Sequence, residues 1–186
     1  MFNIIIKPEI LAHGQFLVKH NNYGKRGVND GKKIDQLVGM VAQCSIMDLL
    51  GYELPPIITE SDCGIDIEYQ NTKIDIKANA YNSHPKLEYK ANVFAAQKHY
   101  NTDVYIFSVV HREQRTITVT GWISKAEFFS KAMFRHEGYL ITKPNGDKFA
   151  LKAPDYAVEI AELNQVGNLN ELIKGLDEYS RTQALR

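Results

Sequence analysis

The sequence predicts an α/β domain in three layers, α/β/α, with a mixed central sheet. Apolar and polar residues alternate strictly along Gly64–Tyr69 and Lys73–Asn79, which is typical of half-buried strands. The run VYIFSVV at Val104–Val110 is apolar enough for a central strand. Helical patterns at 32–50 and 92–100 lie before and after the alternating segments, so we expect these helices to flank the sheet.

The N-terminal segment carries weak structural signals. Residues 1–20 mix an apolar start with Pro8 and Gly14, and they indicate only a short strand or an arm. The next segment, 21–31, is rich in Asn and Gly and predicts a mobile loop that contains Lys25-Arg26. A flexible basic loop beside an active site often grips phosphate, and a bare surface loop explains the same composition.

The segment Lys32–Leu50 has the pattern of a buried helix. Its apolar residues recur at helical spacing and wrap most of the later turns. Gln43 stands inside the apolar run MVAQCSIM, where a buried amide needs hydrogen-bond partners. It shares one face of the helix with Gly39, Gln36 and Lys32, at spacings of three and four residues.

The two alternating strands predict a β-hairpin whose register follows from its turn. With Gln70-Asn71 as a two-residue turn, Ile67 faces Ile74 and Asp66 faces Asp75. Facing carboxylates would put like charges directly across the ladder, with the Cβ atoms of the pair about 5 Å apart, which destabilises a sheet. We therefore expect a cation to neutralise Asp66 and Asp75.

Two kinds of cation suit this position. A divalent ion such as Mg²⁺ binds carboxylate oxygens at roughly 2.1 Å and keeps several waters. Lys77 lies two residues beyond Asp75 on the same face, where its ammonium would orient a metal-bound water and offset charge growing on a phosphate. Alternatively, Lys77 alone pairs with Asp75 on a solvated face.

An aspartate, a short hairpin turn and then D-I-K, with apolar residues on the opposite face, resemble the PD-(D/E)XK nuclease superfamily and its phage- and restriction-type members. The resemblance covers roughly residues 33–135. It implies a restriction-endonuclease-like fold and Mg²⁺-dependent hydrolysis of DNA phosphodiester bonds, with Mn²⁺ as a substitute ion. By resemblance, Asp66, Asp75 and the backbone carbonyl of Ile76 bind the metal, and Lys77 assists the attacking water.

A helix before the hairpin commonly carries a Glu in this superfamily, in a setting like G-x-x-x-E. The segment GMVAQ puts Gln43 at that place, where by resemblance it helps to orient a metal-bound water. An uncharged amide is a weaker ligand, so this departure favours an alternative: a catalytically silent member that binds DNA or a protein partner. A second alternative is an α/β interaction protein with an accidental likeness.

Basic and aromatic residues predict where DNA would lie. Residues Ala80–Lys90 have no periodicity and interleave aromatic with cationic side chains, which suits base stacking and phosphate contact. An ordinary polar loop is equally compatible. The residues expected to contact DNA are Lys25, Arg26, Lys32, Tyr81, His84 and Lys86.

The rest of the chain adds elements to the same domain. They are a second hairpin of 104–110 with 116–122, a helix at 124–134, a third hairpin of 139–142 with 148–152, and a helix at 169–179. Ser124 and Glu127 form a capping-box pattern at a helix start, and Asn145-Gly146 marks a hairpin turn. The last helix either packs on the core or supports a homodimer, which symmetric cutting of two strands would favour.

Composition limits the class of protein. With 186 residues, 44% hydrophobic and 24% charged, we expect one soluble domain, 1–186, in which 136–186 extends the core. The sequence has no run of eighteen apolar residues, and its apolar start meets Lys7-Pro8 almost at once, so we expect neither a membrane span nor a signal peptide. We therefore expect a cytoplasmic, intracellular protein without a membrane partner. The formal net charge of zero does not itself point to nucleic acid. Cys44 and Cys63 lack metal-binding spacing and are expected to be reduced thiols.

Overall fold

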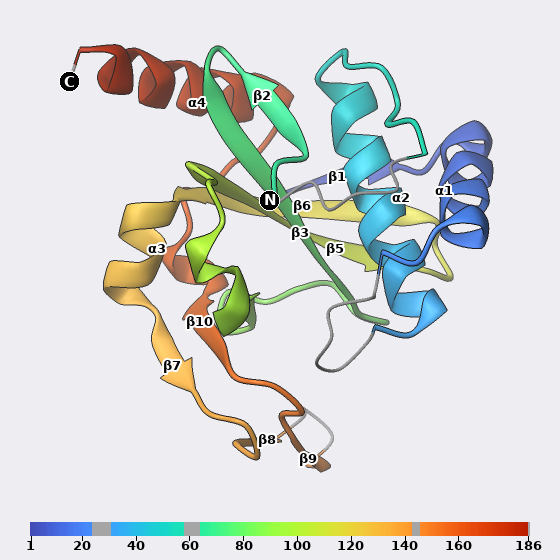
Figure 1. Cartoon of the computed structure of the whole chain (residues 1–186), viewed down its shortest axis with the longest axis vertical. Coiled ribbons are helices and arrows are strands. Elements are labelled where there is room, and N and C mark those ends of the chain that lie inside the picture. Colours follow the sequence, from blue (N-terminus) through green and yellow to red (C-terminus); the bar gives the residue numbers. More distant parts are fainter. Residues whose placement is uncertain (24–30, 58–63, 143–145, 186) are drawn as a thin grey trace.

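The centre of the protein is a sheet of five strands: β1 (Phe2–Ile5), β2 (Ile67–Tyr69), β3 (Thr72–Ala80), β5 (Val104–His111) and β6 (Thr116–Ser124). The structure is a computed structural model that describes residues 1–23, 31–57, 64–142 and 146–185. The strand order is β1–β6–β5–β3–β2 (Figure 1). Strands β3 and β5 run parallel, whereas the other neighbouring pairs run antiparallel. The predicted α/β class with a mixed sheet is therefore confirmed.

Three helices cover one face of this sheet: α1 (Pro8–His20), α2 (Lys33–Leu49) and α4 (Leu169–Ala184). On β3, Ile74 and Ile76 point to this face and pack in one buried cluster with Ile46 of α2 and with Leu172 and Leu176 of α4. The buried helix predicted at 32–50 is confirmed as α2. The C-terminal helix packs on the core and is longer than the predicted 169–179.

A second, smaller sheet covers most of the other face, together with α3 (Lys125–Lys131). Its strands are β4 (Lys90–Phe94), β7 (Met133–Arg135) and β10 (Asp155–Glu159), in the antiparallel order β4–β10–β7. Tyr105 and Phe107 of β5 pack here against Phe128 of α3 and Val93 of β4. The expectation of helices on both faces is thus correct for one face, and a sheet takes most of the other. The strands β8 (Leu140–Thr142) and β9 (Lys148–Ala150) form the predicted third hairpin.

The prediction of a helix at 92–100 is wrong. Residues Lys90–Phe94 form β4, and a 3₁₀ turn, η1, spans Ala95–His99. Ala91 and Val93 are buried while their neighbours in the strand are partly exposed, which is a period of two. Strand β10 pairs with β4 along its whole length, so hydrogen bonds from a distant segment stabilise the strand.

Two other boundaries differ from the prediction. Residues 1–20 form β1 and a full helix, α1. Its first turn accepts Pro8 because the first N–H groups have no acceptor within the helix, so proline removes no helical hydrogen bond. The helix after Ser124 begins as predicted, with Ser124 Oγ accepting a 3.2 Å hydrogen bond from the Glu127 N–H. It ends at Lys131, however, because the chain then turns extended and pairs with β10 as β7.

The β2–β3 hairpin has the predicted register only near its turn. Gln70-Asn71 adopts φ values of 47° and 65°, and Ile67 pairs with Ile74. The strand predicted at Gly64–Tyr69 is shorter, since β2 begins at Ile67, and the ladder pair of Asp66 with Asp75 does not form. Instead, the Asp66 N–H donates a 2.9 Å hydrogen bond to the Ile74 carbonyl.

Candidate active site

Asp75 and Lys77 lie on one side of β3 and form an ion pair. The Lys77 Nζ lies 2.6 Å from Asp75 Oδ2, and the side chains are 17% and 4% exposed, respectively. Both point toward the second sheet, because they sit beside Tyr105 and Phe107 of β5, which pack on that side. The lysine compensates the cost of burying the Asp75 charge.

Asp66 approaches β3 from the edge where β2 has ended. Its Oδ2 accepts a 2.6 Å hydrogen bond from the Ile76 N–H, in place of the ladder partner that a longer β2 would supply. The Ile76 carbonyl points to the same edge, because the N–H and C=O of one strand residue face the same neighbour. Asp66 thus accepts from the Ile76 N–H and Asp75 pairs with the Lys77 ammonium, so the two carboxylates do not form the repulsive facing pair that was predicted.

Gly64 shapes the wall of this site. Its φ of 77° favours glycine, and a Cβ here would clash with the Tyr100 ring and lie 3.2 Å from Asp75 Oδ2. The Gly64 carbonyl accepts a 2.8 Å hydrogen bond from Thr102 Oγ1, and the Lys125 ammonium donates to the Tyr100 carbonyl. Sequence reasoning missed Gly64, Tyr100 and Thr102; the one signal available was the glycine at the start of the alternating segment.

The two carboxylates affect the titration of buried neighbours. Burial, and to a smaller degree the charge of Asp75, raises the pKa of the Tyr105 hydroxyl above its ordinary value. Burial raises the pKa of the Cys44 thiol to about 12, and Asp66 adds to the increase. Both groups therefore stay protonated at neutral pH. Cys63 lies outside the described residues.

Gln43 is buried on α2, as predicted, at 7% exposure. The helix packs directly on β3, the strand that carries Asp75 and Lys77. Among the described residues, no hydrogen bond joins the Gln43 amide to Asp66, Asp75 or Lys77. Its part in the site therefore stays a prediction.

The residues predicted to contact DNA are not gathered around Asp75. Lys25 and Arg26 lie outside the described residues, and Lys32 is exposed at the start of α2. The others follow the end of β3, which lies about 17 Å from Asp75 at about 3.3 Å per strand residue; these are Tyr81, His84 and Lys86. Their contact with DNA also stays a prediction.

The candidate ligands on and beside β3 are oxygen atoms, which are the ligands that a hard divalent cation prefers. Within the described ranges, no three His, Cys, Asp or Glu side chains gather as a metal site. The available donors are the carboxylates of Asp66 and Asp75 and the carbonyl of Ile76. Mg²⁺ commonly takes one or two carboxylates and keeps several waters, so this set fits Mg²⁺ or Mn²⁺ and lacks the nitrogen and sulfur ligands of a zinc site.

Comparison of the chain with models of known protein families, with curated proteins and with solved structures found no significant match. The chemistry of the hairpin therefore stands on its residues and their geometry. No helix in the described part of the chain is long and apolar enough to span a membrane.

Proposed function

We propose that the protein is a Mg²⁺-dependent deoxyribonuclease with a restriction-endonuclease-like fold, which hydrolyses DNA phosphodiester bonds at the β2–β3 hairpin. The observation that carries this proposal is the arrangement along β3. Asp75 pairs with Lys77 at 2.6 Å, and the Asp66 carboxylate is anchored on the Ile76 N–H between them. The PD-(D/E)XK pattern uses these residue types in this order. Action on DNA inside the cell, in the cytoplasm, belongs to the same proposal.

The residues divide the chemistry among them. Asp66, Asp75 and the Ile76 carbonyl would hold Mg²⁺, which when bound polarises the scissile phosphate and lowers the pKa of a bound water. Lys77, whose ammonium now rests on Asp75, would donate hydrogen bonds to the attacking water and to a phosphate oxygen as negative charge grows there. Gln43 would orient a water through its amide. A homodimer would place two such sites on opposite strands of a duplex.

The test is cleavage of supercoiled plasmid, single-stranded DNA and branched DNA by purified protein in Mg²⁺, Mn²⁺ or EDTA. Asp75→Asn and Lys77→Met should lower the cleavage rate by about a hundredfold or more. Lys73→Met is the matched control, because it removes an ammonium from the same face of the same strand. Equal cleavage by wild type and Asp75→Asn would refute the proposal.

A catalytically silent DNA-binding module is the second candidate, and Gln43 favours it. The site lacks a carboxylate from α2, and Gln43 makes no hydrogen bond to the hairpin residues within the described ranges. A silent module would retain DNA in EDTA and release no product from any of the three substrates in Mn²⁺. A nuclease would yield product in Mn²⁺ that EDTA abolishes.

A further inference from the structure

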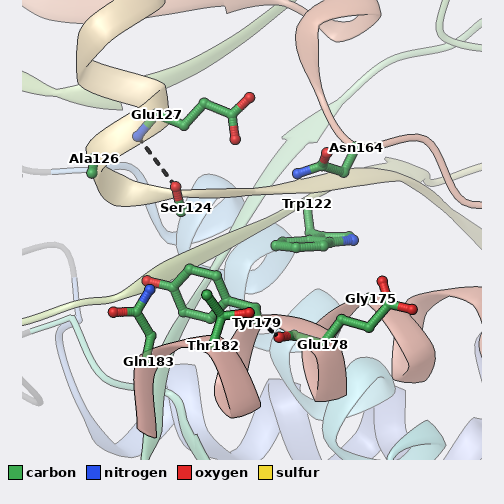
Figure 2. Close-up of a pocket in the computed structure, with 10 residues that line it drawn as sticks. All are labelled: Trp122, Ser124, Ala126, Glu127, Asn164, Gly175, Glu178, Tyr179, Thr182 and Gln183. Atoms are coloured by element: carbon green, nitrogen blue, oxygen red, sulfur yellow. Dashed lines mark hydrogen bonds between the residues drawn. The ribbon is translucent and has the colours of Figure 1, made fainter. Parts of the chain in front are cut away.

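A groove of about 600 Å³ lies between β6, α3 and α4 (Figure 2). Its base is formed by Trp122 of β6, which packs with the helices on the face opposite to Asp75. A volume of this size lies within the range of ligand-binding sites. Because it lies on the opposite face of the sheet, the groove is separate from the hairpin site.

The Trp122 indole is fixed in place. Its backbone exchanges hydrogen bonds of 3.2 Å and 2.8 Å with Asn164, and its ring meets the Tyr179 ring edge to face at 6.2 Å between centroids. The indole also lies directly on the backbone of α4 at Gly175, where a Cβ would be 2.7 Å from Trp122 Nε1. A rigid, partly exposed aromatic surface pays little conformational entropy on binding.

The charge of the groove is negative. Glu127 of α3 and Glu178 of α4 lie on either side of Trp122 in Figure 2, and the described residues that line the groove include no Lys or Arg. Glu127 pairs with Lys131 at 2.8 Å, and Glu178 lies 3.9 Å from Lys174. These ion pairs are exposed, so each contributes little and can yield to a better cation.

The length of the groove suits a short piece of extended chain. Along α4 it runs from Gly175 to Gln183, which is about 12 Å at 1.5 Å per helical residue. About four residues of an extended peptide span that distance. The hydroxyl of Thr182 and the amides of Asn164 and Gln183 line it and can bond a peptide backbone.

We propose that this groove binds a basic peptide segment of a partner protein, with one arginine stacked on Trp122 between Glu127 and Glu178. Arginine fits better than lysine, because a planar guanidinium stacks on an indole and bonds carboxylates with two N–H groups at once. The two glutamates disfavour nucleic acid, whose phosphates they repel. This binding does not depend on the nuclease proposal.

The chain contains one tryptophan, so its fluorescence reports on this groove alone. The probes are two capped tripeptides, Ala-Arg-Ala and Ala-citrulline-Ala, which share a shape and differ in charge. We expect the arginine peptide to change the Trp122 fluorescence in a saturable way. The citrulline peptide should bind at least about tenfold more weakly, a difference of about 1.4 kcal/mol in binding free energy.

The double variant Glu127→Gln/Glu178→Gln should weaken arginine binding by about tenfold or more, whereas Glu53→Gln/Glu113→Gln should leave it unchanged. The control pair removes the same charge at two exposed positions that do not line the groove. Circular dichroism verifies that both variants fold. The proposal is overturned if the arginine peptide causes no saturable change, if citrulline binds equally well, or if the two double variants lose affinity equally.

Discussion

The two partners of the hairpin ion pair differ in their access to water. The Lys77 side chain is 17% exposed and the Asp75 side chain 4%. If Asp75 loses its charge, the lysine ammonium can move toward solvent. If Lys77 loses its charge, a carboxylate with almost no solvent access loses its cation. Removal of one partner from a buried pair is costly for this reason.

Lys77→Met should therefore destabilise the fold by about 3 kcal/mol, and Asp75→Asn should cost clearly less. Urea unfolding in EDTA measures both, so that no divalent ion contributes. Lys73→Met, on the same face of β3, serves as the control and should cost least. If Asp75→Asn lost more unfolding free energy than Lys77→Met, the buried charge of Asp75 would not be what makes the loss of Lys77 costly.

His111 is a second buried titratable residue, at the end of β5 and away from the hairpin carboxylates. It is 2% exposed, and its Nε2 lies 2.8 Å from Thr118 Oγ1, which in turn donates to Asn3 Oδ1. Burial lowers the pKa of His111, the nearby His84 lowers it further, and the Tyr81 backbone opposes the shift. The fold thus favours the neutral imidazole.

The sign of the pH effect follows from that lowered pKa. Above about pH 6.5 the imidazole is neutral in both the folded and the unfolded chain, so its contribution to stability is complete. As the pH falls toward the folded pKa, only the unfolded chain takes up the proton, and stability declines. Unfolding free energies between pH 7.5 and 5 should fall less steeply in His111→Gln. The exposed His136→Gln is the control, and a slope in His111→Gln equal to wild type would contradict this account.

At the scale of elements, two helical glycines have opposite roles. A Cβ added at Gly39 of α2 would meet no atom of the described residues within 4 Å, whereas a Cβ at Gly175 of α4 would meet the Trp122 indole at 2.7 Å. Nothing in the sequence distinguishes the two, since both interrupt an otherwise helical pattern.

Gly39→Ala should stabilise the protein by about 1 kcal/mol, because alanine is the better helix former. Gly175→Ala gains the same helix propensity, but it should lower the stability of the protein by about 1–3 kcal/mol net, because the Trp122 indole must move. Chemical unfolding of the two variants gives both values, each serving as the control for the other. Stabilisation by both substitutions would show that Trp122 does not lie against α4.

Local patterns predict those elements whose signals lie within one segment. The β2–β3 turn and α2 follow from alternation, from Asn at positive φ and from helical periodicity. The prediction of a helix fails at β4 because five residues are too few to distinguish the helical period of about 3.6 residues from the strand period of two. What decides its structure is β10, more than sixty residues further along the chain, and no local pattern reports that pairing.

At the scale of the whole molecule, the same limit applies to the site. Spacing alone puts Asp75 and Lys77 on one face of β3, and the structure has them in contact. The predicted geometry of Asp66 is wrong, because β2 begins only at Ile67 and the Asp66 carboxylate accepts the hydrogen bond of the Ile76 N–H itself. Tyr100 and Thr102 reach the site only through the packing of η1 and β5, which sequence spacing does not encode.

The measurement that tests the central claim most directly is global unfolding of wild type and Asp75→Asn in EDTA, Mg²⁺ and Mn²⁺. An ion that binds only the folded protein, at about a hundred times its dissociation constant, adds about 2.7 kcal/mol to the free energy of unfolding. We expect this gain in wild type and in Glu68→Gln, which removes an exposed carboxylate of the same hairpin, and its absence in Asp75→Asn. A metal site at Asp66 and Asp75 would be contradicted if neither metal changed the free energy of unfolding of wild type, or if Asp75→Asn gained as much stability as wild type.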